Sequence, residues 1–389
     1  MPFRQPATDL IHHAYEPPAG FAAPQLAVHK ASTVIFPDMA SMRARDWRHK
    51  TGYTYGLLGT PTTFVLEERI ATLEGGLQCL LVPSGLAAVT LVDMALLRPG
   101  DELLLPDNVY GPSRAFAQNE LAHWGITHRV YNPLEPAGLA AAIGPATRLV
   151  WLEAAGSVTM EFPDLARLAG IARERGVLTA LDNTWGAGLA FDGFAQGADL
   201  VMQALTKYPS GGGDVLMGSV TTRDLALHKR LKGCHMRLGL GVGGNDCELV
   251  LRSLSSMPLR YHAHDAAARQ LARWLAGRPE VVRVLHPALE GSPGHAHWRA
   301  TCTAAAGLFS VLIDERYRPA QVDAFVDALR LFKIGASWAG PVSLVVHYDL
   351  AQLRPGGALA GHLVRFSIGL EEPAALQADL AQALAAFAA

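Results

Sequence analysis

Seven short apolar runs alternate with longer segments of helical periodicity between about residues 78 and 220. The runs are rich in Val and Leu and read QCLLVPSG, DELLLPDNVY, THRVYNP, TRLVWLEAAG, VLTALDNTW, ADLVMQALTK and VLMGSVTT. Between them, segments such as LAAVTLVDMALLRPG place apolar residues three and four positions apart and carry Gly near the end. Such alternation is typical of a mainly parallel sheet with helices on both faces, so we expect an α/β fold.

The chain of 389 residues is longer than a typical single domain. After Leu259 its character shifts to Ala-rich helical segments around short strands such as GLFSVLID and LVRFSIGL. The first sixty or so residues carry many Pro, Gly and aromatic residues with weak periodicity, which favours an arm that packs on another surface. We therefore predict an arm over 1–60, a large domain over 61–258 and a smaller α+β domain over 259–389.

Charge and hydropathy argue against two classes of partner. The chain has 33 Lys plus Arg and 35 Asp plus Glu, a formal net charge of −2, and no evident basic run for neutralising a phosphate backbone. The start MPFRQPATDLIHHAYEPP lacks the apolar core of a signal peptide, and no apolar stretch reaches membrane-spanning length without Gly, Pro or charge. We expect a cytoplasmic protein with neither a nucleic-acid nor a membrane partner.

Cysteine and histidine spacing does not favour a metal site. The four cysteines are scattered without a C-x-x-C pair, which predicts reduced thiols, at Cys79, Cys234, Cys247 and Cys302. Two H-x-H pairs, at 262/264 and 295/297, could be read as ligands, but residues two apart on a helix point to different faces. We expect solvated or capping histidines and no metal.

Reactive side chains follow the apolar runs. In open parallel sheets, ligands bind at the carboxyl ends of the strands. The residues found there are Ser84-Gly85, Tyr110, Glu153, Asp182-Asn183 and Thr206-Lys207. We expect these side chains to converge on one crevice.

The turn Ser84-Gly85-Leu86 links an apolar run to a helical pattern. The free N–H groups of a helix N-terminus bind phosphate, and Gly permits close approach. A plain Ser N-cap followed by a permissive Gly is the alternative interpretation. Taken alone, the turn leaves both possibilities open.

Two charged residues lie at the ends of neighbouring runs. Asp182 follows an apolar stretch and would need a cationic partner if buried. Lys207 would be partly desolvated, which lowers the pKa of a lysine and makes it a Schiff-base former and general base. Alone, Asp182 could equally cap a helix, and Lys207 could be a solvated surface residue. The combination favours a chemical site.

A glycine-rich segment at 239–244 matches G-x-G-x-x-G, the pattern of dinucleotide-binding loops. The preceding HKRLKGCHMR is basic and unlike a strand, and no strand with an acidic residue follows at the expected spacing. We interpret the segment as a loop near the active site, with a nicotinamide-dependent oxidoreductase as the weaker alternative.

The sequence resembles the Cys/Met-metabolism enzymes that depend on pyridoxal 5'-phosphate, and within them the β-lyases. The resemblance runs nearly from end to end, through YTYGLLGTPTTFVLEERIATLEGG, VPSGLAAV, DNVYGPS, WLEAAGSVTMEFPDL, LDNTWGAG, ALTKYPSGG, HPALEGSPGHAHW, GASWAG and LVRFSIGLEE. It implies fold type I of these enzymes, with a mainly parallel seven-stranded sheet in the large domain and a smaller α+β C-terminal domain.

The resemblance also implies roles around the cofactor ring and phosphate. Lys207 would be the Schiff-base lysine, Asp182 the partner of the pyridine nitrogen and Tyr110 a residue stacked on the ring. The turn 84–86 would bind the phosphate through Ser84 and the backbone N–H groups of Gly85 and Leu86. Thr206 would add a hydroxyl to the same site.

Further implied roles concern substrate and assembly. Arg365 would clamp the substrate carboxylate with its bidentate fork, and Ser337 and Trp338 would line the substrate side. Tyr55 would reach the cofactor phosphate and substrate of a neighbouring subunit. The arm would then contribute to that subunit in a homo-oligomer of at least two copies, with a tetramer usual in the family.

Five places depart from the family pattern. Leu57 stands where an arginine usually grips the phosphate, and Ala154-Ala155 stand where Ser-Pro is common. Ala204 replaces a frequent serine, Met236 falls where a β-lyase has tyrosine, and Ala336 stands where an aromatic residue is expected. The substrate pocket should therefore differ from that of its relatives.

The implied activity is β-elimination from L-cystathionine or another cysteine S-conjugate, which yields a thiol, pyruvate and ammonia. A γ-synthase or γ-lyase of the same family would use the same residues. A catalytically silent relative that acts as an assembly partner is the remaining alternative.

Overall fold

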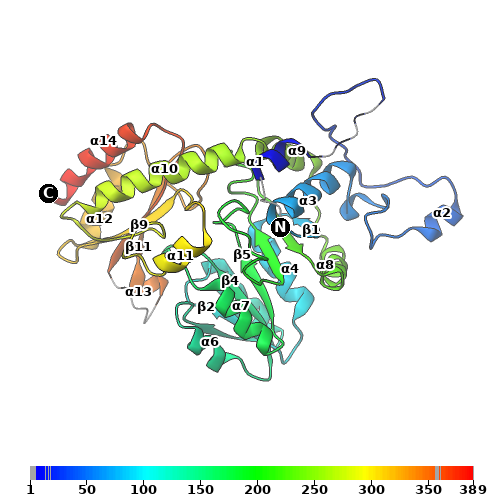
Figure 1. The fold of residues 1–389 in the computed structure, drawn as a ribbon, viewed down its shortest axis with the longest axis horizontal. Helices are drawn as coiled ribbons and strands as arrows, with labels where there is room; N and C mark the ends of the chain where they lie inside the picture. The colour runs from blue at the N-terminus through cyan, green and yellow to red at the C-terminus, as the bar shows by residue number, and fades with distance from the viewer. Residues whose placement is uncertain are drawn as a thin grey trace.

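Two β-sheets organise the chain in the computed structural model, which describes residues 6–13, 15, 17, 19–354, 359 and 361–388 (Figure 1). The first five residues of the predicted arm and the last residue of the predicted small domain lie outside this description. The larger sheet occupies the middle of the chain and the smaller one its C-terminal third.

The seven apolar runs form the seven strands of the larger sheet. These are β1 Gln78–Val82, β2 Glu102–Pro106, β3 Thr127–Tyr131, β4 Thr147–Glu153, β5 Leu178–Asp182, β6 Leu200–Gln203 and β7 Gly218–Thr222. Their order is β1-β7-β6-β5-β4-β2-β3, and only β7 runs against its neighbours. The predicted α/β fold with a mainly parallel seven-stranded sheet is confirmed.

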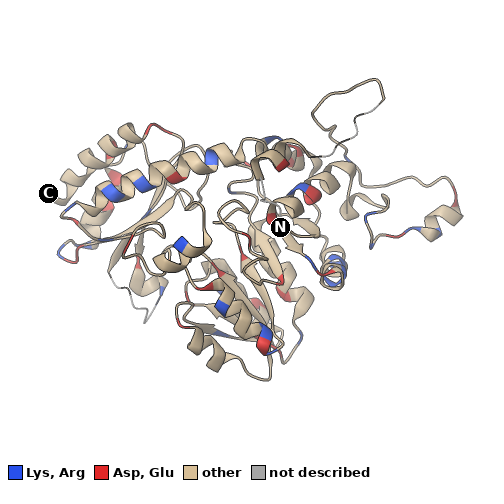
Figure 2. Cartoon of the chain, in the orientation of Figure 1, with Lys and Arg blue, Asp and Glu red and all other residues tan. Residues whose placement is uncertain are grey.

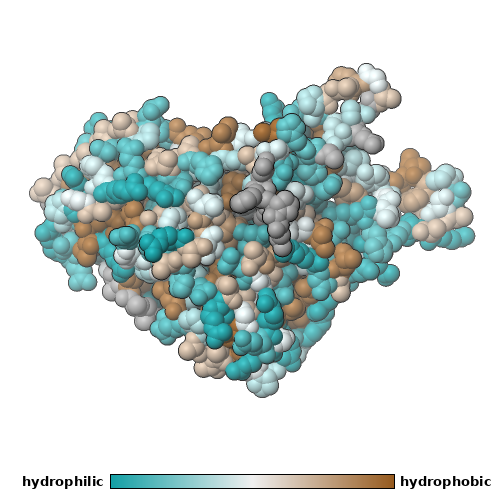
Figure 3. All heavy atoms as spheres, in the orientation of Figure 1, coloured by the Kyte–Doolittle hydropathy of each residue, from teal (hydrophilic) through white to brown (hydrophobic). Residues whose placement is uncertain are grey.

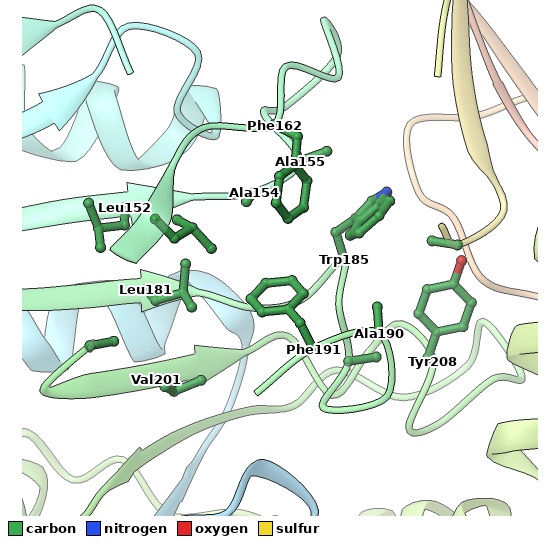
Figure 4. Packing of buried hydrophobic residues seen from close by; sticks show 14 of the residues in the cluster. Leu152, Ala154, Ala155, Phe162, Leu181, Trp185, Ala190, Phe191, Val201 and Tyr208 are labelled. Carbon is green, nitrogen blue, oxygen red and sulfur yellow. The ribbon is translucent and has the colours of Figure 1, made fainter. Parts of the chain in front are cut away.

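Except at the edge strand β3, both faces of this sheet are buried, which explains why strands such as β1 and β2 are almost continuously apolar. Because successive strand residues point to opposite faces, Leu80 and Leu103 pack on the side of α4 (Gly85–Leu96) and α8 (Leu225–Leu238). Their neighbours Leu81 and Leu104 pack on the side of α3 (Pro61–Glu74) and α7 (Leu165–Glu174). Figure 4 shows part of this second cluster, with strand residues packed against aromatic rings from the following loops.

Shorter helices complete the larger layer and the arm. They are α1 Pro6–Ile11, α2 Met39–Ala44, the 3-10 turn Gly56–Leu58, α5 Gly111–Phe116, a π-helical turn Ala117–Leu121, α6 Pro136–Ala142 and α9 Gly244–Leu254.

The smaller sheet has the order β10-β11-β12-β9-β8 and is mainly antiparallel. Its strands are β8 Val281–Leu285, β9 Leu308–Ile313, β10 Lys333–Ile334, β11 Leu344–Asp349 and β12 His362–Ser367. The helices around it are α10 Met257–Ala276, α11 His295–Thr301, α12 Pro319–Asp327, α13 Leu350–Leu353, α14 Pro373–Ala383 and the 3-10 turn Leu384–Ala388. Helix α10 runs through the predicted boundary at 258/259, so the domain division remains a prediction.

The N-terminal arm projects from the body of the molecule and carries exposed apolar side chains (Figures 1 and 3). Ile35 is 90% exposed, Phe21 68% and Met39 56%. Apolar side chains with this exposure favour contact with another surface, and the predicted partner, a second copy of the chain, remains a prediction.

Acidic and basic residues are dispersed over both sheets and their helices (Figure 2). Among the described helices, none combines the length and apolar character needed to cross a bilayer. The described residues also contain no cluster of three or more His, Cys, Asp or Glu arranged to hold a metal. The four cysteines are free thiols.

Asp93, in the middle of α4, provides a test of this packing. Its carboxylate is buried and accepts a hydrogen bond from Trp151 Nε1 at 2.9 Å, and burial raises its pKa to about 7. A carboxyl whose pKa is raised by folding stabilises the fold below its unfolded pKa of about 3.9, and this contribution is lost as the pH rises through the folded pKa. Asp93→Asn, which keeps an acceptor for Trp151, should therefore raise Tm by a few degrees at about pH 8 and by less at about pH 5.

Differential scanning calorimetry at the two pH values measures this effect, and Asp327→Asn, at an exposed position on α12, is the matched control. Equal shifts in Tm at both pH values would contradict an ionised, buried Asp93.

Candidate active site

A cavity of about 240 Å³ lies at the carboxyl edge of the larger sheet, where residues of the smaller sheet face it. Most of the predicted site residues line it: Ser84, Gly85, Leu86, Tyr110, Asp182, Thr206, Lys207, Trp338 and Arg365. The parallel strands β1, β2, β4, β5 and β6 all end at this edge, which brings residues distant in sequence together.

A second cavity, of about 860 Å³, lies between the arm and α3. Lys50 Nζ and Glu67 Oε2 lie 2.6 Å apart there and neutralise each other. The smaller cavity offers the richer chemistry because it combines a lysine, two carboxyls and an arginine.

Lys207 follows β6 by four residues, and its side chain reaches Ser337, which lies between β10 and β11 of the smaller sheet. Nζ donates to Ser337 Oγ at 2.7 Å and lies 5.4 Å from the centre of the Trp338 ring. Burial and the nearby Arg365 lower the pKa of Lys207 to about 8, against the opposing effect of Asp182. The side chain is therefore held in place and deprotonates more readily than a solvated lysine.

Two carboxyls stand at the ends of neighbouring strands. Asp182 ends β5, and its Oδ1 accepts from Thr184 N at 2.9 Å in a local turn with no following helix. Glu153 ends β4, and its Oε2 accepts from Tyr110 N at 2.8 Å. Burial raises the pKa of both carboxyls, and the neighbouring Asp182 charge raises that of Glu153 further. A cationic partner in the cavity would therefore stabilise the ionised form of Asp182.

Tyr110 lies beside these carboxyls at the start of α5. It is 42% exposed, and its pKa is raised by burial and by the charges of Asp182 and Glu153. Its backbone is fixed by Glu153 while its ring is on the cavity lining. A ring anchored in this way is suited to pack against a flat ligand.

The turn before α4 contains both a serine N-cap and a glycine that lines the cavity. Ser84 caps the helix by accepting from Ala87 N at 3.0 Å, while Gly85 and Leu86 at the first turn line the cavity. A Cβ at Gly85 would lie 2.6 Å from the Cβ of Ala204, so the close packing of the two loops requires glycine. The first N–H groups of α4 are thereby offered to an anion.

Thr206 also lines the cavity, but its hydroxyl already has partners. Oγ1 donates to Met217 O at 3.2 Å and accepts from Met217 N at 3.0 Å. Its predicted contact with a phosphate remains a prediction.

Arg365 reaches the cavity from β12 of the smaller sheet. It is 7% exposed, donates from Nη2 to Ala336 O at 2.9 Å, and its guanidinium lies 5.4 Å from the centre of the Tyr348 ring. Burial lowers its pKa, although an arginine stays charged in this environment. The cavity lining thus includes a buried arginine that is suited to bind a carboxylate.

Two predicted site residues, Tyr55 and Ser337, do not line this cavity, although Ser337 Oγ accepts from Lys207 Nζ. Tyr55 precedes the turn Gly56–Leu58 and is 47% exposed. Its predicted contact with a neighbouring subunit remains a prediction. The nearby Leu57 packs toward Gly241, where a Cβ would lie 3.0 Å from Leu57 Cδ1.

The glycine motif at 239–244 joins two helices. Gly239 ends α8 in a left-handed conformation, and Gly244 begins α9. The motif therefore lacks the strand-to-helix context of a dinucleotide site. Neither the motif nor Met236, on α8, lines the 240 Å³ cavity.

Several cavity residues were not predicted from the sequence. They come from the turn 156–161, from Trp185, from Leu216 and from Leu308 on β9. Trp185 is 4% exposed, and its Nε1 has no hydrogen-bond partner among the described residues. Figure 4 shows its ring between Phe162 and Tyr208. No local pattern distinguishes such residues from core, because tertiary packing alone brings them to the cavity.

The residues present fit pyridoxal 5'-phosphate. A desolvated lysine amine, a carboxyl that favours a cation and the open N-terminus of α4 match its aldehyde, ring nitrogen and phosphate in turn. The cavity also supplies Arg365 for an amino-acid carboxylate.

Comparisons with known proteins agree with this chemistry. The family model described as Cys/Met metabolism PLP-dependent enzyme matches residues 7–385. A putative cystathionine beta-lyase of Rhizobium johnstonii is 40% identical over 376 residues, covering 95% of this chain and 93% of that protein. A cystathionine beta-lyase of Bordetella avium is 39% identical over 382 residues, with 95% and 94% covered.

Structural and more distant relatives extend the comparison. The crystal structure of metB from Corynebacterium glutamicum matches with a TM-score of 0.90 at 27% identity, covering 98% of both chains. A protein of Pseudomonas putida named L-methionine gamma-lyase is 33% identical, covering 98% of this chain and 98% of that protein. A protein of Wolbachia pipientis named L-alanine/L-glutamate racemase is also 33% identical, covering 86% of this chain and 83% of that protein. The chain therefore belongs to the Cys/Met-metabolism family of pyridoxal-phosphate-dependent enzymes.

Proposed function

We propose that the protein is a carbon–sulfur lyase that performs β-elimination on L-cystathionine or another cysteine S-conjugate. The reaction breaks one Cβ–S bond and consumes one water, giving a thiol, pyruvate and ammonia; from cystathionine the thiol is homocysteine. The observation that supports this most is the contact of Lys207 Nζ with Ser337 Oγ in the cavity that also holds Asp182 and Arg365. The relatives named cystathionine beta-lyase support the same reaction.

The residues around the ring would bind and polarise the cofactor. When bound, the cofactor supplies a cationic ring that accepts the electron pair developing at the substrate Cα. Asp182 would hold the proton on the ring nitrogen, and Tyr110 would pack on the ring face. The N–H groups of Gly85 and Leu86 would bind the phosphate, with Ser84 and Thr206 beside them.

Lys207 and Arg365 would act on the substrate. Arg365 would bind the α-carboxylate and orient Cα toward Lys207 Nζ, whose free amine takes the Cα proton. Ser337 would hold Nζ in position for the proton transfer, and Trp338 would close the cavity beside Nζ. The lowered pKa of Lys207 supports this role because it favours the neutral base.

The pKa of Lys207 leads to a prediction about cofactor loading. Since the neutral amine is the nucleophile, covalent attachment of pyridoxal phosphate to the apoprotein should accelerate as pH rises and level off above about pH 8. An ordinary lysine, with a pKa near 10.4, would still be accelerating at about pH 9. Stopped-flow absorbance measures this rate, and a rate that continues to rise tenfold between about pH 8 and pH 9 would contradict the lowered pKa.

A γ-lyase is the second candidate, supported by the relative named L-methionine gamma-lyase. It would use the same lysine but break the Cγ–S bond and form 2-oxobutyrate. The wall beside Arg365 includes the apolar Val158, Leu308 and Ala336, which would fit an apolar sulfur substituent as well as part of cystathionine.

The two reactions are distinguished by their products from L-cystathionine. We expect the enzyme loaded with cofactor to form pyruvate and homocysteine in equal amounts, measured by liquid chromatography and mass spectrometry. Parallel reactions with S-methyl- and S-benzyl-L-cysteine establish whether other conjugates are preferred. Abundant 2-oxobutyrate and cysteine with little pyruvate would overturn the β-lyase proposal.

We further propose an active homo-oligomer, with a tetramer as the expected form. The exposed Tyr55 and the apolar side chains of the arm support a second copy that completes each cavity. We expect the mature protein to act in the cytoplasm on a small amino-acid substrate.

A further inference from the structure

We propose that Arg354 is a positioning residue that fixes the wall of the cavity to the small domain that carries Arg365. The inference rests on the proposed function, because it concerns how the substrate carboxylate is aligned with Lys207. Arg354 does not line the cavity and acts through two loops that do.

Arg354 is well placed to connect the two domains. It directly follows α13, in the connection between β11 and β12, and β12 carries Arg365. Its Nη2 lies 2.6 Å from Asp107 Oδ1, while Nη1 donates to Thr159 Oγ1 at 2.9 Å and to Glu161 Oε1. One guanidinium of the small domain therefore holds two separate segments of the large domain.

The two segments are also joined to each other. Asn108 Nδ2 donates to Glu161 Oε2 at 3.1 Å, and Ser157 N donates to Asn108 O at 2.9 Å. Asp107 and Asn108 begin the loop that leads to Tyr110. The turn 156–161 supplies Ser157, which lines the cavity. A displacement of Arg354 would therefore move both the loop that carries Tyr110 and the turn 156–161 that lines the cavity.

The turn 156–161 needs external support because its backbone is strained. Val158 has a φ of 70° and Met160 a φ of 60°, and a β-branched residue rarely adopts this left-handed region. A Cβ at Gly156 would lie 1.9 Å from Asn108 Nδ2, so the turn is also packed tightly against the other loop. Ser310 Oγ, on β9, donates to Val158 O at 2.6 Å. Two side chains of the smaller domain, Arg354 and Ser310, therefore form hydrogen bonds that hold this turn.

Removing the guanidinium would leave the buried carboxylate of Glu161 and the partly exposed carboxylate of Asp107 without the cation that they share. Glu161 is 5% exposed, and its Oε2 is bonded only within the large domain, to Thr159 and Asn108. An unpaired buried carboxylate at Glu161 would draw in water, which would loosen the turn. Lys207 and Asp182 are not bonded to this network, so the chemical step should suffer less than substrate alignment.

The test uses Arg354→Met in the full-length enzyme loaded with cofactor. We expect KM for the conjugate that the wild type cleaves to rise about tenfold or more and kcat to fall by no more than about threefold, since hydrogen bonds to charged groups have effects of this size. Glu161→Gln in the Arg354→Met background should lower KM part of the way back to the wild-type value, because it removes one unpaired charge. The KM of Arg354→Lys should lie between those of the wild type and Arg354→Met, since a lysine lacks the planar fork that binds both carboxylates.

The control is Arg129→Met, which removes a half-exposed arginine from its ion pair with the buried Glu102 at the opposite edge of the sheet. Arg129 Nε and Nη2 donate to Glu102 at 2.6 and 2.7 Å, and Thr147 Oγ1 also donates to Glu102. Arg129→Met should lower Tm while KM stays at the wild-type value. A KM for Arg354→Met within twofold of the Arg129→Met value would overturn the proposal.

A second readout does not depend on activity. In the apoprotein, Arg354→Met should speed amide hydrogen exchange in peptides covering 104–116 and 153–163, and Arg129→Met should not. Unchanged exchange in both peptides would overturn the positioning role even if KM rose. A wild type without lyase activity would instead contradict the proposed function while leaving the exchange result intact. If Arg354→Met does not fold, Arg354→Lys with wild-type KM and exchange would also overturn the proposal.

Discussion

Replacing Lys207 with alanine is expected to abolish covalent attachment of the cofactor and to lower kcat by about 10³-fold or more. Nζ is the amine in contact with Ser337 and is kept partly neutral by burial and by Arg365. Among the residues that the structure describes, no other lysine lines the cavity. The purified variant should lose the absorption of a lysine-bound cofactor and show negligible pyruvate formation.

Lys229→Ala is the matched control, because Lys229 is exposed on α8 and does not line the cavity. It should keep both the absorption and the activity of the wild type. Full activity of the Lys207→Ala variant would refute the assignment of Lys207 as base and attachment site.

Asp182→Asn should lower kcat by about 10²- to 10³-fold. Burial raises the pKa of this carboxyl, so a cationic ring nitrogen beside it would stabilise its ionised form. An amide of the same shape cannot hold the proton on that nitrogen, and charge at Cα would be delocalised less well. The effect should fall mainly on kcat because Asp182 does not contact Arg365 in the structure.

The same assays and a visible absorption spectrum measure this effect. Asp199→Asn is the control, since Asp199 accepts from Thr179 N at 2.8 Å at the other edge of the same sheet. Asp182→Glu should recover part of the activity by restoring the charge. A variant Asp182→Asn with kcat within threefold of the wild type would contradict a role beneath the ring nitrogen.

The larger sheet was predictable because all of its strands except the edge strand β3 are buried on both faces. Runs such as QCLLV and ELLLP have no polar alternation, and tight turns follow them, so their identity and approximate ends can be read locally. Since parallel strands end at one edge, the meeting of Tyr110, Asp182 and Lys207 followed from the fold class.

The remaining features depend on contacts distant in sequence. The order of the smaller sheet and the packing of Leu308 into the cavity have no local signal. Neither has the left-handed Val158, which lies where a β-branched residue is unfavourable by itself. Arg354 looks in the sequence like an ordinary charged residue before Pro355, and its partners Glu161 and Asp107 are 193 and 247 residues away.

Mapping the lysine that carries the cofactor is the most direct test of the central claim. The wild-type enzyme is loaded with pyridoxal phosphate, the lysine–cofactor bond is fixed with sodium borohydride, and peptides are sequenced by tandem mass spectrometry. We predict one modified lysine per chain, at Lys207. A modification at another lysine, or none after complete loading, would contradict the account.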